Sequence, residues 1–250
     1  MSATLLPCRL CGQQKHLIKA HIIPKQFYRR IMGGTPNLLK FEVDNVVNQT
    51  TTQNGIHQND LLCAECDNQI GQYDKYAYEV LPPKIDQKKL KSPFGHGLHI
   101  YKIGEIRVEI FRLFLVSLVW RAGIARDPMF QLVKLGEYED RLKQILLGKK
   151  TELLDAVTAV IVLFCPPKYP NIMWSPFSSK MEGINIATFY LPPWKLLLKL
   201  DRRPFNDPFD KFALSAGKPT FAAVQDFWSK GEFKLLCDFH KKSRIAAGLE

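Results

Sequence analysis

The sequence of 250 residues predicts an α+β protein, and three observations support this fold class. Two C-x2-C cysteine pairs lie within residues 1–66, which is typical of a small unit held together by a metal. Residues 105–125 carry a broad apolar face at helical spacing. Residues 157–200 contain short β-branched and apolar segments bounded by proline or glycine, which is typical of strands.

The two cysteine pairs are Cys8 with Cys11 and Cys63 with Cys66. Each C-x2-C pair turns two thiolates toward one point, and two pairs together make the tetrahedral four-cysteine site that zinc prefers. Gly12 follows the first pair and lets the chain turn back at little steric cost. The alternative is a redox dithiol or a chance pairing. We expect a structural Zn2+ bound by all four cysteines.

Short strands are expected at residues 17–18 and 22–23, on either side of His21, and Pro24 ends their ladder pairing. Residues 33–59 are polar, with a minor strand expected at residues 39–43. This polar segment is too long for a hairpin loop. We interpret it as an insertion, either between two strands or between a strand and the following helix.

Lys25, Arg29 and Arg30 form a basic cluster with aromatic residues between them. Such a cluster can bind phosphates and stack on bases. The alternative is a short amphipathic helix at residues 26–32 whose basic face is solvated.

The segment after Cys63 is predicted to be a helix, because its apolar residues recur at helical spacing and a proline pair follows at residues 82–83. Asp67 and Asp74 are seven residues apart and therefore lie on one side of this helix. Asp74 is expected to be a solvated acid at the edge of the apolar stripe.

The cysteine pairs, the A-H-I-I-P segment at residues 20–24 and the L-L-C-x2-C-D segment at residues 61–67 resemble the HNH, or ββα-metal, endonuclease family in its zinc-stapled bacterial members. The resemblance covers about the first 80 residues. It implies a treble-clef, ββα-metal fold for this unit, and metal-dependent hydrolysis of phosphodiester bonds in DNA.

The resemblance also implies residue roles. His21 matches the general base of the hairpin, and Asn59 approximates the asparagine that braces it. Asp67 stands where the family usually has a metal-binding histidine, and a carboxylate there suits a catalytic Mg2+ or Mn2+. Ala20 stands where many members have an acid or a histidine. The catalytic ion would therefore depend on Asp67, with Asp74 or His57 as additional candidates.

Residues 84–97 are basic, weakly patterned and rich in breakers, so we expect a boundary there between a first domain at residues 1–92 and a second at residues 93–250. The second domain is expected to begin with the helix at residues 105–125. Arg121 suits the C-terminal dipole of that helix, and we favour this role over one at the active site.

Further elements of this mixed helical and β domain follow from periodicity. We expect a helix at residues 138–147, strands at 157–164, 184–191 and 194–200, and helices at 219–230 and 234–242. No phosphate-binding loop, dinucleotide fingerprint or G-x-S-x-G motif occurs, so the sequence assigns this domain no function.

The net charge of +11 is spread over both halves of the chain, which favours polyanionic partners. DNA is the first candidate and RNA the second. No signal peptide is evident, and the most apolar stretch is too short to span a membrane. Cys165 and Cys237 lie in apolar surroundings typical of buried single cysteines, so we expect a reducing, cytoplasmic location and no membrane partner.

The sequence leaves three functional classes open. The first is a metal-dependent DNA endonuclease. The second is a zinc-stapled nucleic-acid-binding protein whose catalytic centre has decayed. The third is a protein-interaction module in which the second domain recognises the partner.

Overall fold

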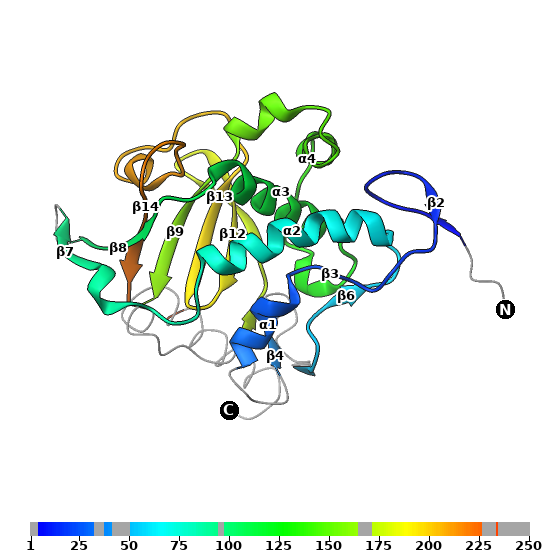
Figure 1. The fold of residues 1–250 in the computed structure, drawn as a ribbon, viewed down its shortest axis with the longest axis horizontal. Helices are drawn as coiled ribbons and strands as arrows, with labels where there is room; N and C mark the ends of the chain where they lie inside the picture. The colour runs from blue at the N-terminus through cyan, green and yellow to red at the C-terminus, as the bar shows by residue number, and fades with distance from the viewer. Residues whose placement is uncertain are drawn as a thin grey trace.

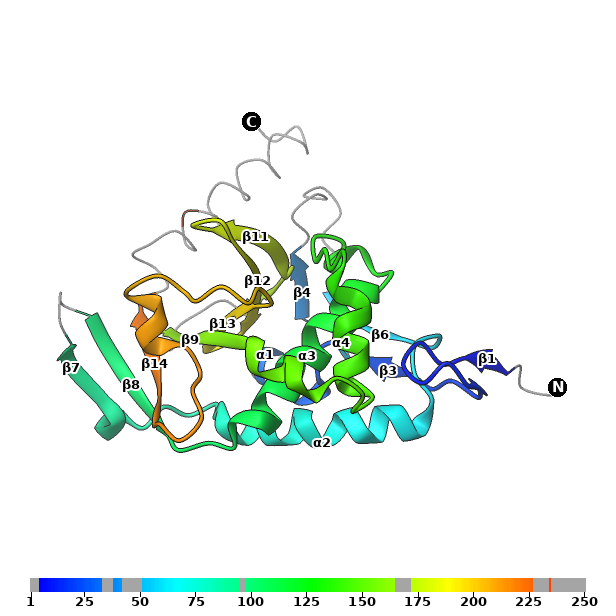
Figure 2. The same cartoon turned by 90° about the horizontal axis from the view of Figure 1, so that it is seen from above.

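The computed structural model describes residues 5–32, 38–41, 51–94, 98–164, 172–226 and 234. It is a mixed α+β structure, as the sequence predicts. Helices α2 and α3 lie across one face of a large sheet, and the β1–β2 turn projects beyond the end of α2 (Figures 1 and 2). The predicted helix at residues 234–242 lies outside the described residues, apart from its first position, and so do Cys165 and Cys237.

The N-terminal unit contains two short antiparallel strand pairs followed by a helix. β1 (Leu6–Pro7) pairs with β2 (Gln14–Lys15), and β3 (Ala20–His21) pairs with β6 (His57–Gln58). Helix α2 (Ala64–Val80) follows, where the sequence predicts it.

The polar segment at residues 33–59 begins after β3 and ends with β6, so it is inserted between two paired strands, the first of the two predicted positions. The strands expected at residues 17–18 and 22–23 are wrong, because His21 lies within β3 itself and pairs with β6. Helix α1 (Lys25–Met32) precedes the polar segment, which contains β4 (Leu38–Phe41) and β5 (Thr51–Thr52). β4 also pairs in parallel with β10 (Ile172–Trp174), so the insertion is joined to a distant part of the chain.

The central helix is α3 (Val108–Ile124), which packs against α2 and against α4 (Tyr138–Leu146). Both α3 and α4 lie where the sequence predicts helices. A helix that is apolar on nearly all sides is stable only when other elements surround it, and almost every residue of α3 is buried.

Seven strands form the main sheet in the order β11-β12-β13-β9-β14-β8-β7. Their neighbours are antiparallel except for the parallel pair β14 and β9. The strands are β7 (Leu90–Phe94), β8 (Leu98–Gly104), β9 (Thr158–Phe164), β11 (Phe177–Met181), β12 (Ile184–Leu191), β13 (Trp194–Lys199) and β14 (Thr220–Gln225).

The predicted helix at residues 219–230 is wrong over its described part, because residues 220–225 form strand β14. β14 fills the gap between β8 and β9, and its backbone N–H and C=O groups pair on both sides. Thr220, Phe221 and Val224 are β-branched or aromatic and suit this position. Pairing in the sheet therefore outweighs the weak helical pattern of the segment.

Short 3-10 turns complete the fold at Gln87–Lys89, Pro128–Phe130, Thr151–Ala156 and Phe209–Phe212. Strand β9 is buried on both faces, with Ala159, Ile161 and Leu163 toward the helices and Val160 and Val162 toward a smaller cluster behind the sheet.

The larger apolar cluster runs without interruption from Cys8 through the helices to Ala222. The division into residues 1–92 and 93–250 stays a prediction, and strand β7 lies across its boundary. Within the described residues, no helix is both long and apolar enough to cross a membrane.

Candidate functional site

Four cysteine side chains meet at the N-terminal end of α2. Cys8 and Cys11 lie in the turn between β1 and β2, while Cys63 and Cys66 lie at the start of α2. Their sulfur atoms all lie within 4.8 Å of one another, and Cys11 Sγ is 4.0 Å from Cys63 Sγ. Tetrahedral zinc with bonds of roughly 2.3 Å separates its sulfur ligands by roughly 3.8 Å. The cluster therefore fits a structural metal such as zinc.

Backbone hydrogen bonds hold the first cysteine turn in place. Gly12 N–H donates to the Cys8 carbonyl at 2.8 Å, and Gly12 has a φ of +77°. Arg9 N–H donates to the Leu61 carbonyl at 2.8 Å, and Cys63 N–H donates to Cys8 Sγ at 3.4 Å. The turn between β1 and β2 is thereby fixed against the start of α2.

The thiol pKa values reflect this packing. Burial raises the pKa of Cys8, but N–H groups of Cys11, Cys63 and Leu10 outweigh it and bring the pKa down to about 7. Burial raises the pKa of Cys66, and the neighbouring thiols raise it further. A bound divalent cation has the opposite effect on Cys66: its positive charge stabilises all four thiolates and so lowers the pKa of the thiols.

His21 lies in β3, directly opposite His57 in β6, with their ring centroids 5.8 Å apart. His21 Nε2 is 3.0 Å from the Asn54 carbonyl oxygen. A carbonyl only accepts hydrogen bonds, so this contact assigns the proton to Nε2 and leaves the lone pair on Nδ1. Burial lowers the pKa of His21; the Asn54 carbonyl opposes this, and His57, Lys25 and Arg121 lower the pKa further.

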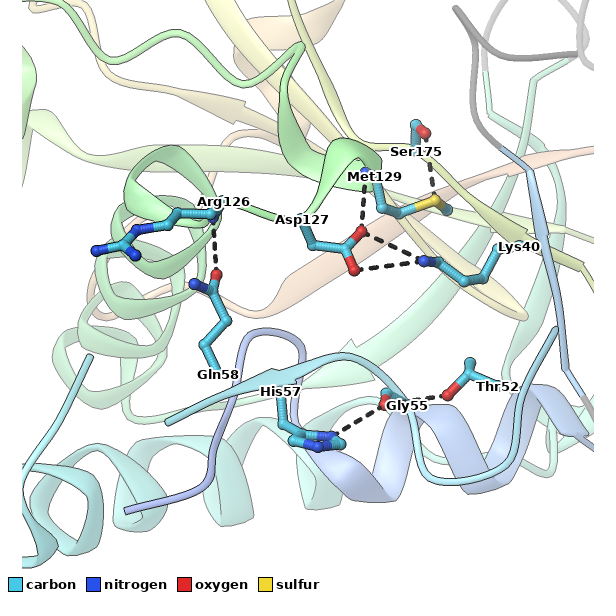
Figure 3. A network of polar contacts seen from close by, with 9 residues as sticks. All are labelled: Lys40, Thr52, Gly55, His57, Gln58, Arg126, Asp127, Met129 and Ser175. Carbon is cyan, nitrogen blue, oxygen red and sulfur yellow. Dashed lines mark hydrogen bonds and ion pairs between the residues drawn. The ribbon is translucent and has the colours of Figure 1, made fainter. Parts of the chain in front are cut away.

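The Asn54 carbonyl belongs to a tight turn whose shape depends on Gly55. Gly55 has a φ of +77°, and a Cβ there would lie 2.1 Å from the Tyr28 ring. Thr52 Oγ1 and the His57 ring both contact the Gly55 carbonyl, at 3.1 and 3.3 Å (Figure 3). This turn therefore orients both histidines.

Arg121 and Asp74 form a buried ion pair next to His21. Arg121 Nη1 and Nη2 donate to the two Asp74 oxygens at 2.9 and 2.7 Å, and the Arg121 side chain is 2% exposed. Nη1 also donates to the His21 backbone carbonyl at 3.1 Å. Ser117, one turn earlier on α3, accepts hydrogen bonds through its carbonyl and its hydroxyl. One guanidinium thus joins α3, α2 and β3.

This pair corrects two expectations. Arg121 is not merely a partner of the helix dipole, and Asp74 is buried rather than solvated. Both side chains point into the α2–α3 contact, where an ion lacking an opposite charge is strongly destabilised. Burial raises the pKa of Asp74, and the Arg121 guanidinium opposes this with two charge-assisted hydrogen bonds, which favour the carboxylate.

Asp67 lies in the first turn of α2 and is half-buried. Burial raises the pKa of Asp67, and Arg121 opposes this. Among the described residues, the four cysteines are the only group of three or more potential ligands with atoms within 4.8 Å of one another. His21, Asp67 and His57 therefore do not make such a group, and both oxygens of Asp74 are already bonded to Arg121.

Asn59 is exposed and directly follows β6. Its neighbour Gln58 connects β6 to the chain after α3: Gln58 Oε1 accepts a hydrogen bond from Arg126 N–H at 2.8 Å (Figure 3). The sequence gives no indication of this contact. Arg126 also forms an ion pair with Asp60 at 2.7 Å. These contacts fix β6 to the segment after α3.

The basic cluster is divided on α1. Lys25 and Arg29 are exposed, whereas the Arg30 guanidinium lies 4.9 Å from the centre of the Phe27 ring and 4.3 Å from that of Tyr78. Arg30 therefore packs α1 against α2, and Lys25 and Arg29 face solvent.

A further ion pair joins the insertion to the turn after α3. Lys40 Nζ lies 3.3 Å from an oxygen of Asp127, and Asp127 caps its own turn by accepting a hydrogen bond from Met129 N–H at 2.9 Å (Figure 3).

No protein-family model, curated protein or solved structure matches the chain. Its function is therefore inferred from the geometry of the cysteine cluster and of the His21 hairpin.

Proposed function

We propose that the chain is a metal-dependent endonuclease that hydrolyses phosphodiester bonds in DNA, with His21 as the general base. The observation that carries the proposal is the fixed orientation of His21, whose Nε2 lies 3.0 Å from the Asn54 carbonyl oxygen.

The protonation state of His21 suits a base. The pKa of His21 is lowered below 6.5, chiefly by burial, so the neutral form dominates at neutral pH. With the proton on Nε2, Nδ1 can accept a proton from a water molecule. The Arg121 bond to the His21 carbonyl and the turn at Gly55 hold the backbone and the ring of this residue.

Asp67 is the residue that would hold a catalytic Mg2+ or Mn2+. Mg2+ in proteins is commonly bound by one or two carboxylates, with water and substrate phosphates completing its coordination. Asp67 alone fits such a site only when a phosphate supplies further oxygens. When bound, the ion would neutralise charge that develops on the phosphate.

Nucleic acid is the proposed substrate because of the charge and its placement. The chain carries a net charge of +11, and Lys25 and Arg29 are exposed on α1, shortly after His21 in the sequence. A phosphate backbone bound by such side chains releases counterions, so its affinity falls with salt.

The test is cleavage of plasmid DNA by His21→Ala in Mg2+ and Mn2+. We expect a loss of roughly 10²–10⁴-fold, the range that general-base catalysis supplies, with zinc content and DNA binding unchanged. Asp67→Asn should lose comparable activity and recover part of it at high Mn2+. Wild-type cleavage should decline only at a pH more acidic than that at which an ordinary histidine titrates, because burial lowers the pKa of His21 and the residue becomes protonated only there.

Two exposed residues provide matched controls. His99→Ala, on β8, and Glu79→Gln, on α2, should leave cleavage unchanged. Wild-type protein that cleaves neither DNA nor RNA in Mg2+, Mn2+, Ni2+ or Zn2+ would contradict the nuclease assignment.

A second candidate is a zinc-stapled protein that binds nucleic acid without cutting it. It is favoured by the absence, within the described residues, of a second group of three metal ligands near His21. Salt-dependent DNA binding without any cleavage would select this candidate over the nuclease.

A further inference from the structure

A cavity of about 460 Å³ lies where β9 begins and β13 ends, and neither the cysteines nor His21 line it. Its walls come from the turn Thr151–Ala156, the start of β9 and the segment that leads from β13 into β14. In Figures 1 and 2 this orange segment lies on the side of the molecule away from β3 and β6, inward of β7. The volume is within the usual range for a small-molecule site.

The charged side chains that line the cavity are predominantly basic. Five basic residues face two acidic ones: Arg112, Lys199, Arg202, Lys211 and Lys218 against Asp155 and Asp210. Arg202 and Lys218 are exposed, and neither has an ion-pair partner within the described part of the chain. An anion entering the cavity therefore meets cations whose charge is not already neutralised.

Two buried polar atoms of the lining residues lack a hydrogen-bond partner among the described residues. They are Arg112 Nε and Thr220 Oγ1, in side chains of residues that are 8% and 5% exposed. Arg112 Nη1 does form an ion pair with Asp155, whose side chain is 85% exposed. Both atoms are covered by neighbouring protein atoms, so they belong to the wall of the cavity, and the cations that face its interior are the exposed Arg202 and Lys218.

The cavity is preformed, because its walls are hydrogen-bonded to the sheet. Thr158 Oγ1 donates to the Leu214 carbonyl at 3.2 Å, and Leu214 N–H donates to the Ala159 carbonyl at 3.3 Å. Lys199 Nζ donates to the backbone carbonyls of Asp201 and Arg203 at 2.6 Å each.

Aromatic side chains supply an apolar surface beside the charges. Phe205 and Phe212 are buried lining residues, and Phe221 is a partly buried one. A ligand with both a charged and a planar apolar part matches this combination better than an inorganic anion does, because rings can stack on aromatic side chains.

We infer that this cavity binds a small phosphorylated molecule of the nucleotide class, with the phosphate near Arg202 and Lys218 and the base against the phenylalanines. The inference does not depend on nuclease activity, because neither His21 nor a cysteine of the cluster lines the cavity.

The test is titration calorimetry of the full chain with the four ribonucleoside monophosphates, pyrophosphate and the matching nucleosides. At least one monophosphate should bind at one site per chain, and its nucleoside should bind at least tenfold more weakly. Lys218→Glu and Arg202→Glu should each weaken binding about 10-fold or more, as expected for losing a charge-assisted contact. Both side chains are exposed, so these variants should fold.

Lys180→Glu is the matched control, because it makes the same charge change at an exposed position on the edge strand β11 and should leave binding unchanged. No binding of any phosphorylated probe would overturn the inference. Equal weakening by Lys180→Glu would also overturn it, since diffuse charge would then be responsible. Binding of oligonucleotides alone, lost in Lys218→Glu, would reassign the cavity to a nucleic-acid surface.

Discussion

Helix α2 is fixed to the N-terminal strands β1 to β3 at two places, by two different kinds of interaction. At its N-terminus, Cys63 and Cys66 meet the cysteines of the β1–β2 turn. In its middle, Asp74 binds Arg121, which also binds the carbonyl of His21. The first attachment is a cluster of four cysteines that can bind a metal, whereas the second is a buried pair of opposite charges.

The two attachments differ in what happens to the fold when one of their side chains is removed. Without a metal, neutral thiols interact only weakly and thiolates repel one another, so we expect the cysteine attachment to need all four cysteines and a bound ion. In the Arg121–Asp74 pair each charge is stabilised mainly by the other, so removing one leaves a buried ion unpaired. We therefore expect the cysteines to determine whether the N-terminal unit folds, and the ion pair to determine how α2, α3 and β3 align.

The largest effect is expected from the cysteine attachment. Cys63→Ser or Cys66→Ser should abolish the binding of about one zinc per chain and unfold the N-terminal unit, because zinc-binding and folding free energies are coupled. Zinc analysis and thermal melting measure the two effects. A chain that lacks zinc but melts unchanged would contradict a structural role for the cluster.

The next effect concerns the ion pair. Arg121→Met should lower the free energy of unfolding by about 3–5 kcal/mol, because it leaves Asp74 buried without its partner. The double variant Arg121→Met, Asp74→Leu should recover most of that loss, since it removes both charges. Urea denaturation measures both.

The exposed pair Arg141 and Glu137, at 2.9 Å, provides the control. Arg141→Met should cost less than about 1 kcal/mol. Equal losses of unfolding free energy in Arg121→Met and Arg141→Met would show that burying the Arg121–Asp74 pair contributes little to its effect on stability.

The two attachments also differ in how far the sequence predicts them. The cysteine ligands are recognisable from the sequence, because the two members of each C-x2-C pair lie close together in the chain. Helices α2, α3 and α4 and strands β9, β12 and β13 also follow from local periodicity. These features depend on residues close together in the sequence.

The Arg121–Asp74 pair and the Gly55 turn could not be predicted in this way. Arg121 and Asp74 are 47 residues apart, and nothing in either segment indicates that α3 packs on α2 through this pair. The helix predicted in place of strand β14 is wrong for the same reason, since the neighbours of this strand, β8 and β9, come from distant parts of the chain. Each of these features depends on contacts that exist only in the folded chain.

The smallest effect is expected at the turn that orients His21. Gly55→Ala should destabilise the protein by about 2–4 kcal/mol, because it combines an unfavourable positive φ with a clash against the Tyr28 ring. Gly148 has a similar φ of +69°, and a Cβ there meets nothing within 4 Å. Gly148→Ala should therefore cost only the backbone strain, about 1 kcal/mol. If the Asn54 carbonyl orients His21 for catalysis, Gly55→Ala should also lower the rate of DNA cleavage measured below its melting temperature, whereas Gly148→Ala should not. Equal destabilisation by the two variants would show that the Tyr28 ring can move aside, and that the turn constrains His21 less tightly than the contact distances indicate.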